Sequence, residues 1–417
     1  MAEASVPAEK QARRAARARH TPGMTVEIQH LTAADVAPAL QALEQAFGGA
    51  AHPEDAEVEA SVVDPARFYA ARDGELVVGT AGSFAFSMTV PGGPVPVAGV
   101  TWVSVLPTHR RQGVLSALMT RQLVDLHEEG SAVAALWATE AAIYGRYGYG
   151  TAAWLLALAL PRGAAFRSPV PPGRLRLEEP GAQVQETYAR VAARTAGWPQ
   201  RDDAWWGFRL HDPEHRRDGA SPLQCVVTDG GYALYATTVS WGDGVPAGEV
   251  RVREVVAETT AARARLWRYL LDLDLMGTVR VPAVATDDPL LTDLLAEPRV
   301  ARASLRDCLH VRLVDVPAAL ALRRYAADID VVLAVTDRHC PWNDGSWRLV
   351  GGRDGATCTR TDETPDLELD VADLGAAYLG GTPLRSRPVH ERTSDALGRA
   401  STAFGPLEGA PWCPQVW

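Results

Sequence analysis

The spacing of apolar and polar residues over the first 160 positions predicts alternating strands and helices. A short strand over 26–30 precedes a helix that begins at Thr32, with Asp35 as its capping-box partner, and ends at Gly48. Apolar runs broken by Asp-Gly and Pro-Gly-Gly turns predict antiparallel strands over 68–71, 75–90 (interrupted at 79–82) and 95–106. A one-sided apolar helix over 112–129 and a buried strand over 132–138 follow.

A segment rich in proline, glycine and arginine after Pro161 indicates a linker into a second unit. That unit repeats the strand, helix, strand order that ends the first, and its predicted elements are a helix over 184–196, strands over 222–236 and 249–256, a helix over 261–273 and a strand over 278–285. Beyond Ser304 the pattern changes to short strands, the first over 309–313, around short helices. We expect a disordered basic arm over 1–24 and three folded units over 25–164, 165–303 and 304–417.

Composition narrows the classes of protein that remain. Hydrophobic residues make up 47% of the chain and charged residues 22%, which excludes a fully disordered chain and a membrane protein. The first 24 residues carry +3 and the whole chain −10, so the rest carries −13. An acidic body disfavours nucleic acid and favours a cationic small partner, although solubility alone also explains it. Five scattered cysteines without a CxxC pair predict a cytoplasmic protein.

The segment from Trp102 to Ser116 is the most informative stretch for function. A strand ends, the chain turns through His109, Arg110 and Arg111, Gly113 permits close backbone approach, and a helix begins. Backbone N–H groups and the dipole at a helix N-terminus form an anion site, for which we expect a pyrophosphate. An ordinary basic turn before a helix is the alternative for this motif taken alone.

A second motif follows the next predicted strand. Tyr144-Gly-Arg-Tyr-Gly148-Tyr149 fits Y-x-x-x-G-[FY], and Tyr144 lies 31 positions after Gly113. Together the two motifs resemble the acetyl-CoA site of the GNAT superfamily of N-acetyltransferases. The resemblance implies that backbone groups of Val103, Ser104 and Val105 hold the pantetheine arm at a bulged strand. It implies that the pyrophosphate is wrapped by Arg111, Gln112, Gly113, Val114, Leu115 and Ser116.

The same resemblance places Thr139 and Glu140 beside the thioester and makes Tyr144 the proton donor to the departing thiolate. A phenol has a pKa of about 10, in the range of a CoA thiolate. Leu115 departs from the family pattern, which has glycine or alanine there. Tyr149 stands where phenylalanine is commoner, and the neighbouring tyrosines of the motif are open to either a packing or a catalytic role.

The second unit repeats the order of elements without the motifs. Its corresponding stretch, 255–265, has no glycine in the place of Gly113, and no Y-x-x-x-G-[FY] follows. The chain over 25–417 resembles the Eis family of actinobacterial acetyltransferases, and the expected fold class is α/β (α+β). The resemblance implies an active GNAT fold, a degenerate second GNAT fold that does not bind CoA, and a sterol-carrier-like third domain.

The Eis resemblance also implies a homohexamer and acetylation of aminoglycosides and other polyamines at several amines, with acetyl-CoA as co-substrate. In that family the free C-terminal carboxylate accepts a proton. The corresponding group in this chain is the carboxylate of Trp417. Trp412 and Trp417 would lose burial if the chain end were frayed, which favours an ordered terminus. A terminus merely packed against its own domain is the alternative. No metal, nucleic acid or membrane partner is expected. The His211–His215 segment fits the H-x-x-E-H zinc pattern, but Pro213 predicts a broken helix there.

Three functions remain in competition. The leading one is acetyl transfer from acetyl-CoA to primary amines of cationic small molecules. The second is acetylation of protein lysines or arylamines. The third is lipid or sterol binding by 304–417 beside a vestigial transferase. The physiological acceptor is not readable from the sequence, because acceptor pockets are built from loops without shared motifs.

Overall fold

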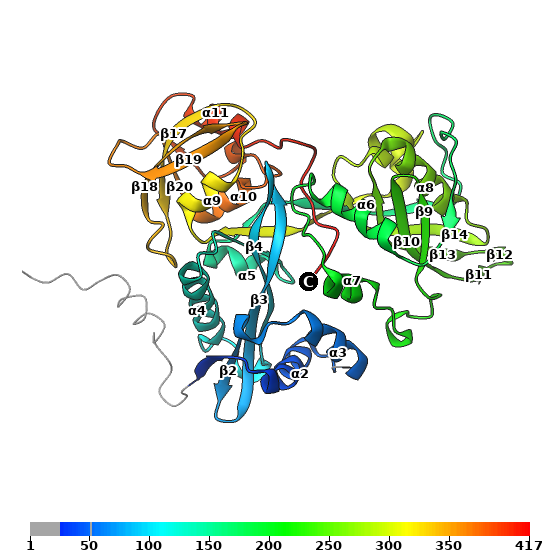
Figure 1. Ribbon diagram of the computed structural model, residues 1–417, viewed down its shortest axis with the longest axis horizontal. Coiled ribbons are helices and arrows are strands. Elements are labelled where there is room, and N and C mark those ends of the chain that lie inside the picture. The colour runs from blue at the N-terminus through cyan, green and yellow to red at the C-terminus, as the bar shows by residue number, and fades with distance from the viewer. Residues whose placement is uncertain (1–25, 51) are drawn as a thin grey trace, which may run out of the picture.

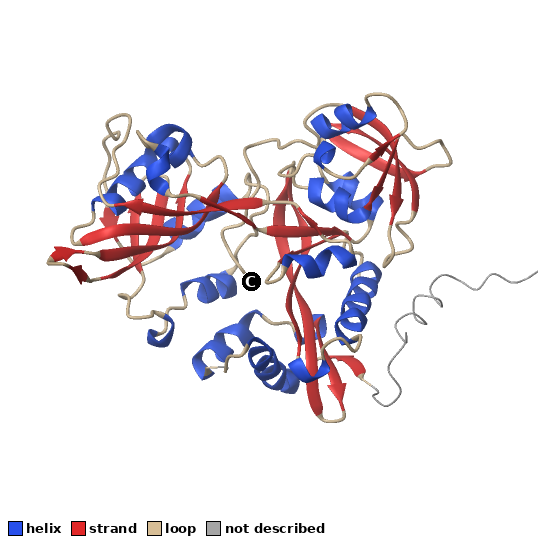
Figure 2. Cartoon of the chain, turned by 180° about the vertical axis from the view of Figure 1, so that it is seen from behind, coloured by secondary structure: helices blue, strands red, loops and turns tan. Residues whose placement is uncertain are grey.

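The chain folds into three units, which a computed structural model describes over residues 26–50 and 52–417 (Figure 1). The predicted basic arm over 1–24 lies outside the described residues. Two mixed sheets of seven strands and a smaller sheet of five form most of the β-structure of the described residues, beside one two-stranded hairpin, and helices lie against the three larger sheets (Figure 2). No helix of the described part is both long and apolar enough to span a bilayer.

The first sheet has the strand order β1-β2-β3-β4-β5-β16-β6, and only β4 and β5 run parallel to one another. Its strands are β1 (Glu27–His30), β2 (Phe68–Asp73), β3 (Leu76–Val90), β4 (Gly93–Val105), β5 (Val133–Trp137), β6 (Gly150–Thr151) and β16 (Leu309–Leu313). The helices of this unit are α2 (Val36–Phe47), α3 (Pro53–Val62), α4 (Val114–Glu128) and α5 (Ala141–Tyr144). The predicted Thr32–Asp35 capping box and the Gly48 helix end are confirmed.

The second sheet has the order β15-β7-β14-β13-β10-β9-β8, with a parallel pair at β13 and β14. Its strands are β7 (Trp154–Pro161), β8 (Arg176–Leu177), β9 (Gln224–Thr228), β10 (Gly231–Thr238), β13 (Gly248–Ala257), β14 (Met276–Ala285) and β15 (Ser304–Asp307). The helices are α6 (Ala182–Ala192), α7 (Asp203–Leu210) and α8 (Thr260–Asp272), and β11 (Trp241–Gly242) pairs with β12 (Val245–Pro246) in a separate hairpin. The single strand predicted over 222–236 is two strands joined by a turn at Asp229 and Gly230.

The third unit is a five-stranded sheet in the order β19-β18-β17-β20-β21. Its elements are β17 (Ile329–Thr336), β18 (Gly345–Gly352), β19 (Gly355–Arg360), β20 (Leu367–Asp370), β21 (His390–Glu391), α9 (Val316–Leu322), α10 (Val371–Ala377) and α11 (Ala396–Ala403). α10 packs on the first sheet at glycine contacts, since a Cβ at Gly150 would lie 1.9 Å from the Ala372 carbonyl oxygen. A buried ion pair from Arg312 of β16 to Asp337, at 2.7 Å, adds to this contact.

The two large sheets exchange strands. β7 lies within the predicted first unit but pairs with β14 and β15 of the second sheet. β16, expected as the first strand of the third unit, instead pairs with β5 and β6 of the first sheet. Apolar Leu309, Val311 and Leu313 of β16 are buried there, so the exchange completes the first core. The domain boundaries at 164 and 303 remain predictions. They divide the chain in sequence order, whereas the sheets combine strands from both sides of these boundaries.

Three further differences from the predicted elements concern the first and second units. β3 is continuous where an interruption was expected, because the irregularity is a register shift against β4 rather than a break. Helices α3 and α7 were not predicted. The sequence of α3 lacks an apolar stripe, and none of its residues is buried.

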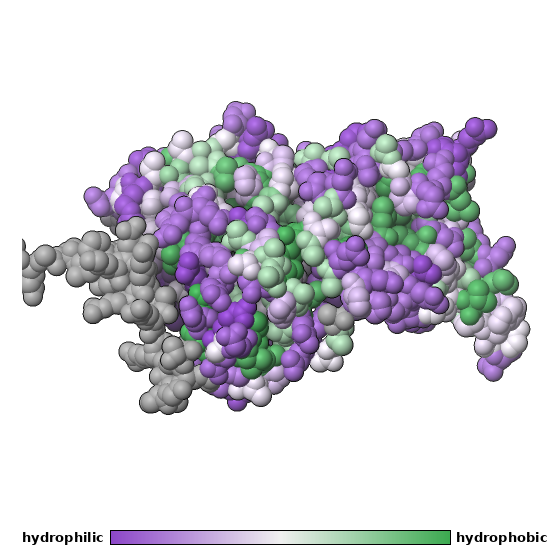
Figure 3. All heavy atoms as spheres, turned by 60° about the horizontal axis from the view of Figure 1, so that its bottom comes forward, coloured by the Kyte–Doolittle hydropathy of each residue, from purple (hydrophilic) through white to green (hydrophobic). Residues whose placement is uncertain are grey.

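The face of the molecule seen in Figure 3 is mainly hydrophilic with smaller hydrophobic areas.

Candidate active site

Strands β4 and β5 diverge at the site that the motifs indicate. Their parallel pairing covers Ala98 to Val100 and stops there. Beyond it, Trp102 takes a φ of 53°, and the register of β4 against β3 shifts at the same place. β4 then continues to Val105, so backbone groups of Val103, Ser104 and Val105 on the β5 side have no strand partner. An extended ligand arm has backbone donors and acceptors available in this gap.

Helix α4 opens with unsatisfied backbone donors. Gly113 is its N-cap, with a φ of 87° that favours glycine and with no side-chain cap. The Ala117 N–H donates to the Gly113 carbonyl at 2.9 Å. The N–H groups of Val114, Leu115 and Ser116 precede that bond and have no acceptor within the helix. This helix N-terminus has the chemistry of a phosphate cradle.

The basic turn before α4 is held by one arginine and leaves the next one free. Arg110 donates to the Val105 and Ala46 carbonyls at 3.2 and 3.1 Å. Gln112 donates to the Thr108 carbonyl at 3.0 Å, so its side chain stabilises the turn itself. Arg111 is exposed, with a φ of 62°, and its side chain has no partner among the described residues. Its guanidinium is therefore available to an anion at the start of α4.

The two motifs meet across α4 and α5. The Ser116 hydroxyl lies 3.0 Å from that of Tyr147, and Leu115 packs in the same cluster as the motif tyrosines. Tyr147 and Tyr149 are fully buried. Of the three tyrosines only Tyr144 lines a cavity, and its hydroxyl has no hydrogen-bond partner among the described residues. The geometry thus separates Tyr144 from its two neighbours.

The pKa of Tyr144 lies above the value assumed from the sequence. Burial raises the pKa to about 12, with smaller contributions from Glu140 and Tyr147. Glu140 is exposed at the start of α5, and Thr139 is exposed beside it. The phenol is therefore protonated throughout the physiological range, as a proton donor requires, but it is a weaker acid than an unperturbed phenol.

The last residue of the chain lies on β4, close to the divergence of the strands. The Trp417 indole donates to the Val100 carbonyl at 3.2 Å, and the Thr101 hydroxyl donates to a C-terminal oxygen of Trp417 at 3.2 Å. The Trp417 ring packs edge-on against Phe86, with centroids 5.0 Å apart. In Figure 1 the C-terminus lies between the first and second units, beside α7.

The second unit anchors the segment that ends at Trp417. Trp412 packs on Trp198, and its N–H donates to the Ala196 carbonyl at 3.2 Å. The side chain of Gln415 accepts from Arg201 at 2.7 Å, and Arg201 in turn forms a bidentate pair with Glu254 at 2.9 and 3.0 Å.

This anchor is buried and charged. Burial alone would raise the pKa of Glu254, but Arg201 and Arg209 beside it hold that pKa at about 2. A fully ionised pair in the core fixes the orientation of the residues that it contacts. The central unit therefore positions the end of the chain.

A cavity of about 450 Å³ connects these features. Four of the predicted site residues line it: Val103, Thr139, Tyr144 and Trp417. Ser104, Val105, Glu140 and the 111–116 loop do not, which is consistent with separate regions for an amine-side pocket and an anion-binding loop. The rest of the lining consists of residues that were not among the predicted site residues: Leu43, Glu44, Phe47, Glu59, Val62, Phe84, Val100, Thr101, Trp102, Trp137, Ala138, Phe208 and Val416.

Every ionisable group on this lining is acidic or phenolic. Glu44 and Glu59 accompany Tyr144 and the C-terminal carboxylate, and no lysine, arginine or histidine lines this part of the described chain. Burial raises the pKa of Glu59 to about 7; Arg216, whose Nη2 is 3.8 Å away, opposes the shift, and Glu44 and Asp55 add to it. Carboxylates beside aromatic rings, with no basic residue on the lining itself, suit an ammonium ligand.

The zinc-like pattern at 211–215 has a different role. α7 ends at Leu210 and a short 3-10 helix begins at Glu214, so the break predicted at Pro213 is confirmed. His211 and His215 both contact the carboxylate of Asp55, each at 3.0 Å, and so join α3 to the second unit. Ligand atoms of His52, Glu54 and His215 lie within 4.8 Å of one another, but the two imidazoles are stacked at 3.6 Å rather than convergent.

Comparison with known proteins agrees with the three units. Residues 27–152 match an acetyltransferase (GNAT) domain family, residues 197–313 match a second acetyltransferase (GNAT) domain family, and residues 316–414 match a sterol carrier protein domain. An uncharacterized N-acetyltransferase of Streptomyces avermitilis is 44% identical over 94% of this chain and 99% of its own length.

Two further relatives carry a more specific name. The N-acetyltransferase Eis of Mycobacterium tuberculosis is 34% identical over 79% of this chain and 84% of its own length. The crystal structure of Eis1 from Mycobacterium abscessus superposes with a TM-score of 0.81 at 32% identity, covering 94% of this chain and all of that one. A GCN5-related N-acetyltransferase from Kribbella flavida, at 24% identity and a TM-score of 0.78, shares the fold.

Proposed function

The chain belongs to the Eis family of GNAT N-acetyltransferases, and from this premise we propose that it acetylates primary amines of cationic small molecules such as aminoglycosides, at more than one amine. GNAT enzymes take the acetyl group from acetyl-CoA. The acid-lined cavity between α2, α3, β4 and the C-terminus carries the acceptor part of the proposal.

The residues present fit acetyl-CoA, which supplies an activated thioester acetyl group. The free N–H groups at the start of α4 and the unpaired Arg111 suit a pyrophosphate, and the open edge of Val103 to Val105 suits an amide-bearing arm. Gln112 and Leu115 contribute main-chain rather than side-chain contacts, because the first is bonded to the turn and the second is packed inward. Thr139 and Glu140 flank the gap at the end of β5.

Tyr144 is the proposed proton donor to the leaving sulfur. It combines an accessible, unpartnered hydroxyl with a pKa of about 12, so the proton is present at every pH at which the enzyme works. The C-terminal carboxylate of Trp417, on the same cavity, is the proposed acceptor for the proton of the attacking amine. Both groups act on a complex that contains donor and acceptor together.

Glu44 and Glu59 are proposed to bind the ammonium groups that do not react. A polyamine carries several charges, and no basic residue lies on the lining of the pocket, although Arg216 approaches Glu59 to 3.8 Å from outside it. Because the pKa of Glu59 is about 7, its charge is lost as the pH falls through that value. The acceptor KM should then rise below pH 7 in the native enzyme, and this rise should be absent from Glu59→Gln.

An acceptor screen tests the proposal. Purified enzyme and acetyl-CoA are incubated with tobramycin, spermidine, a lysine-containing peptide or an arylamine, and products are counted by mass spectrometry. We expect multiply acetylated tobramycin and acetylated spermidine at much higher kcat/KM than the peptide or the arylamine. A preference for either of the last two would replace the proposed acceptor class, whereas CoA binding without any turnover would favour the lipid-binding alternative.

The assembly and the location of the protein remain proposals as well. The family resemblance favours a homohexamer, which sedimentation of the full chain tests directly. Five scattered cysteines, all free, support the proposal of a cytoplasmic location. Fractionation of the producing cell checks it.

A further inference from the structure

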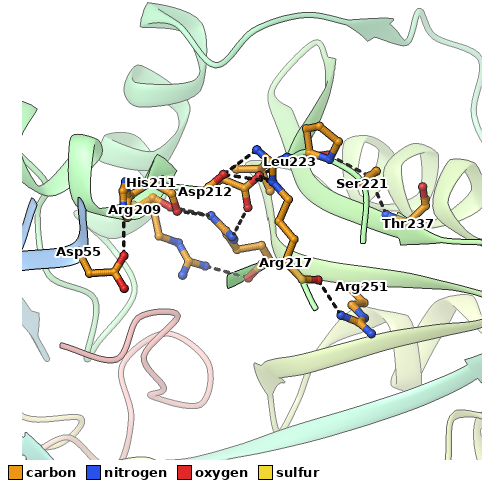
Figure 4. A network of polar contacts seen from close by, with 11 residues as sticks. Asp55, Arg209, His211, Asp212, Arg217, Ser221, Leu223, Thr237 and Arg251 are labelled. Carbon is orange, nitrogen blue, oxygen red and sulfur yellow. Dashed lines mark hydrogen bonds and ion pairs between the residues drawn. The ribbon is translucent and has the colours of Figure 1, made fainter. Parts of the chain in front are cut away.

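A second cavity lies along the C-terminal segment, next to the acid-lined one, and has the opposite charge. It measures about 470 Å³, and Trp412 to Val416 form part of its wall. The remainder comes mainly from α7, the loop after it and β13. In Figure 4 the arginines of this region lie on the green central unit, beside the pale red C-terminal segment.

Basic residues dominate the lining of this cavity. Six arginines line it: Arg209, Arg216, Arg217, Arg251, Arg253 and Arg306. The acidic residues on the lining are Asp212, Glu254 and Asp307, which leaves a surplus of three positive charges. This surplus stands in a chain whose described body is strongly acidic, so the positive potential is local to the cavity.

The carboxylates near the cavity are shared between arginines. Asp212 pairs with both Arg217 and Arg253, at 2.9 and 3.1 Å. Glu254 pairs with both Arg201 and Arg209, at 2.9 and 3.2 Å. Each carboxylate thus neutralises one of two guanidinium charges.

The third shared carboxylate is Glu249, which pairs with Arg251 at 3.2 Å and also with Arg280 of the neighbouring strand. Much of the remaining hydrogen bonding of these arginines goes to main-chain carbonyls, which carry no net charge. Arg209 donates to the Arg253 carbonyl and Arg251 donates to the Arg217 carbonyl, at 2.8 and 3.2 Å. Arg216 is paired with Asp55 at 2.8 Å, outside the lining. The network therefore orients the guanidinium groups and neutralises their charge only in part.

Two of the arginines are open to a ligand. The Arg251 side chain is 40% exposed, and Arg306 is exposed with no side-chain partner among the described residues. Asp307, next to Arg306, is bonded to His310 at 2.8 Å. Guanidinium groups held in fixed orientations recognise planar carboxylates and phosphates through paired hydrogen bonds.

We propose that this arginine-lined cavity binds a small multivalent oxyanion, a di- or tricarboxylate or a phosphate compound, at a site separate from the acetyl-transfer centre. Arg251 and Arg306 contact the anion, and the shared pairs of Asp212 and Glu254 hold the remaining guanidiniums in place. The site is distinct from the proposed acceptor pocket because its lining is basic rather than acidic, and the two cavities share only Trp137 and Val416.

Isothermal titration of the full chain with citrate and with inorganic pyrophosphate tests the site and distinguishes the two ligand sources. At least one probe should bind with 1:1 stoichiometry, more weakly at high salt. Arg251→Gln and Arg306→Gln should each weaken binding about tenfold, the loss of a charge-assisted hydrogen bond. Arg306 has no structural contact to lose, so its variant keeps the test valid if Arg251→Gln fails to fold.

The matched control is Arg280→Gln. Arg280 shares Glu249 with Arg251 but does not line the cavity, so its variant should change the affinity less than twofold. Pyrophosphate also has access to the loop at Arg111, and Arg111→Gln measures that contribution. The proposal is overturned if neither probe binds, if Arg280→Gln weakens binding as much as Arg251→Gln, or if only Arg111→Gln reduces it.

Discussion

Two strand-to-helix junctions occupy equivalent places in the two GNAT units and treat their backbone donors in opposite ways. Between β4 and α4 the N-cap is Gly113, which has no side-chain cap. Between β13 and α8 the N-cap is Thr259, in extended conformation, and its hydroxyl accepts from the Ala262 N–H at 3.2 Å. The first junction leaves its donors for a ligand, and the second satisfies one of them internally.

Charge strengthens the difference. Arg111 stands free before the open junction, whereas Glu258 precedes the capped one and pairs with Arg190 at 3.0 Å. A carboxylate at a helix N-terminus stabilises the helix and repels a phosphate. The fold is thus shared, while ligand binding depends on two or three residues at the turn. The second unit instead anchors the C-terminal segment through Arg201 and Glu254.

The largest expected effect comes from changing the end of the chain that the second unit positions. One alanine added after Trp417, or a C-terminal amide made by semisynthesis, moves or removes the carboxylate. We expect kcat to fall about 10²–10⁴-fold, the usual contribution of a general base. CoA affinity, measured by titration, should be unchanged. Normal turnover by the amide would exclude the carboxylate as proton acceptor.

Breaking the anchor itself should affect stability more than any surface change. Glu254→Gln leaves Arg201 and Arg209 without a full charge partner in the core, at a cost of about 3–5 kcal/mol in the free energy of unfolding. The pKa of Glu254 is lowered to about 2 in the fold, so its stabilisation is present above pH 4.5 and lost as the pH falls towards 2.

Denaturant titration at pH 7 and pH 3 measures both effects of Glu254→Gln. The wild type should lose more stability than the variant between the two pH values. Glu249→Gln, on the same strand but more exposed, is the control and should cost under about 1 kcal/mol. If Glu254→Gln and Glu249→Gln lowered the free energy of unfolding equally, the buried pair would contribute no more to stability than the exposed one.

Closing the open junction should weaken donor binding moderately. Gly113→Ala places a side chain at a φ of 87°, which costs about 1–2 kcal/mol, or roughly a tenfold loss in CoA affinity if the turn relaxes. Gly130→Ala is the matched control, because it also has positive φ and open space around a new Cβ but lies at the other end of α4. The CoA affinity of Gly130→Ala should equal that of the wild type.

Opening the capped junction is the smallest change. Thr259→Ala should destabilise the second unit by about 1 kcal/mol, the usual value of a lost N-cap, and calorimetry measures the shift in Tm. Thr260→Ala, one residue later and without a capping bond, should leave Tm unchanged. No CoA site should appear in Thr259→Ala, since Glu258 remains. CoA binding by the second unit of Thr259→Ala would show that the N-cap alone accounts for the difference between the two junctions.

Local signals allowed much of the fold to be predicted from the sequence. The helix starting after Thr32, the strands on either side of the 107–113 turn and the α4 periodicity are encoded by neighbouring residues. The exchange of β7 and β16 between the sheets is not encoded locally. The apolar pattern of each strand suits either sheet, so only long-range packing selects the strand with which it pairs.

The site divides in the same way. Gly113 and Tyr144 belong to motifs with fixed spacing, so the sequence alone indicates them. Glu44 and Glu59 come from α2 and α3 and meet only after folding, and Phe208 comes from another unit. α3 has no apolar stripe and α7 is only eight residues long, so neither helix was predicted, and the acceptor side of the pocket was missed with them.

The contact between Thr101 and Trp417 joins distant parts of the chain. The two residues are separated by 316 positions, so the contact requires the first unit and the segment that follows the third unit to be folded together. On the proposed role of the Trp417 carboxylate, a fragment that contains the first unit alone would keep its cofactor motifs but lack the group that accepts the amine proton. Acetyl transfer is then a property of the assembled chain rather than of the first unit.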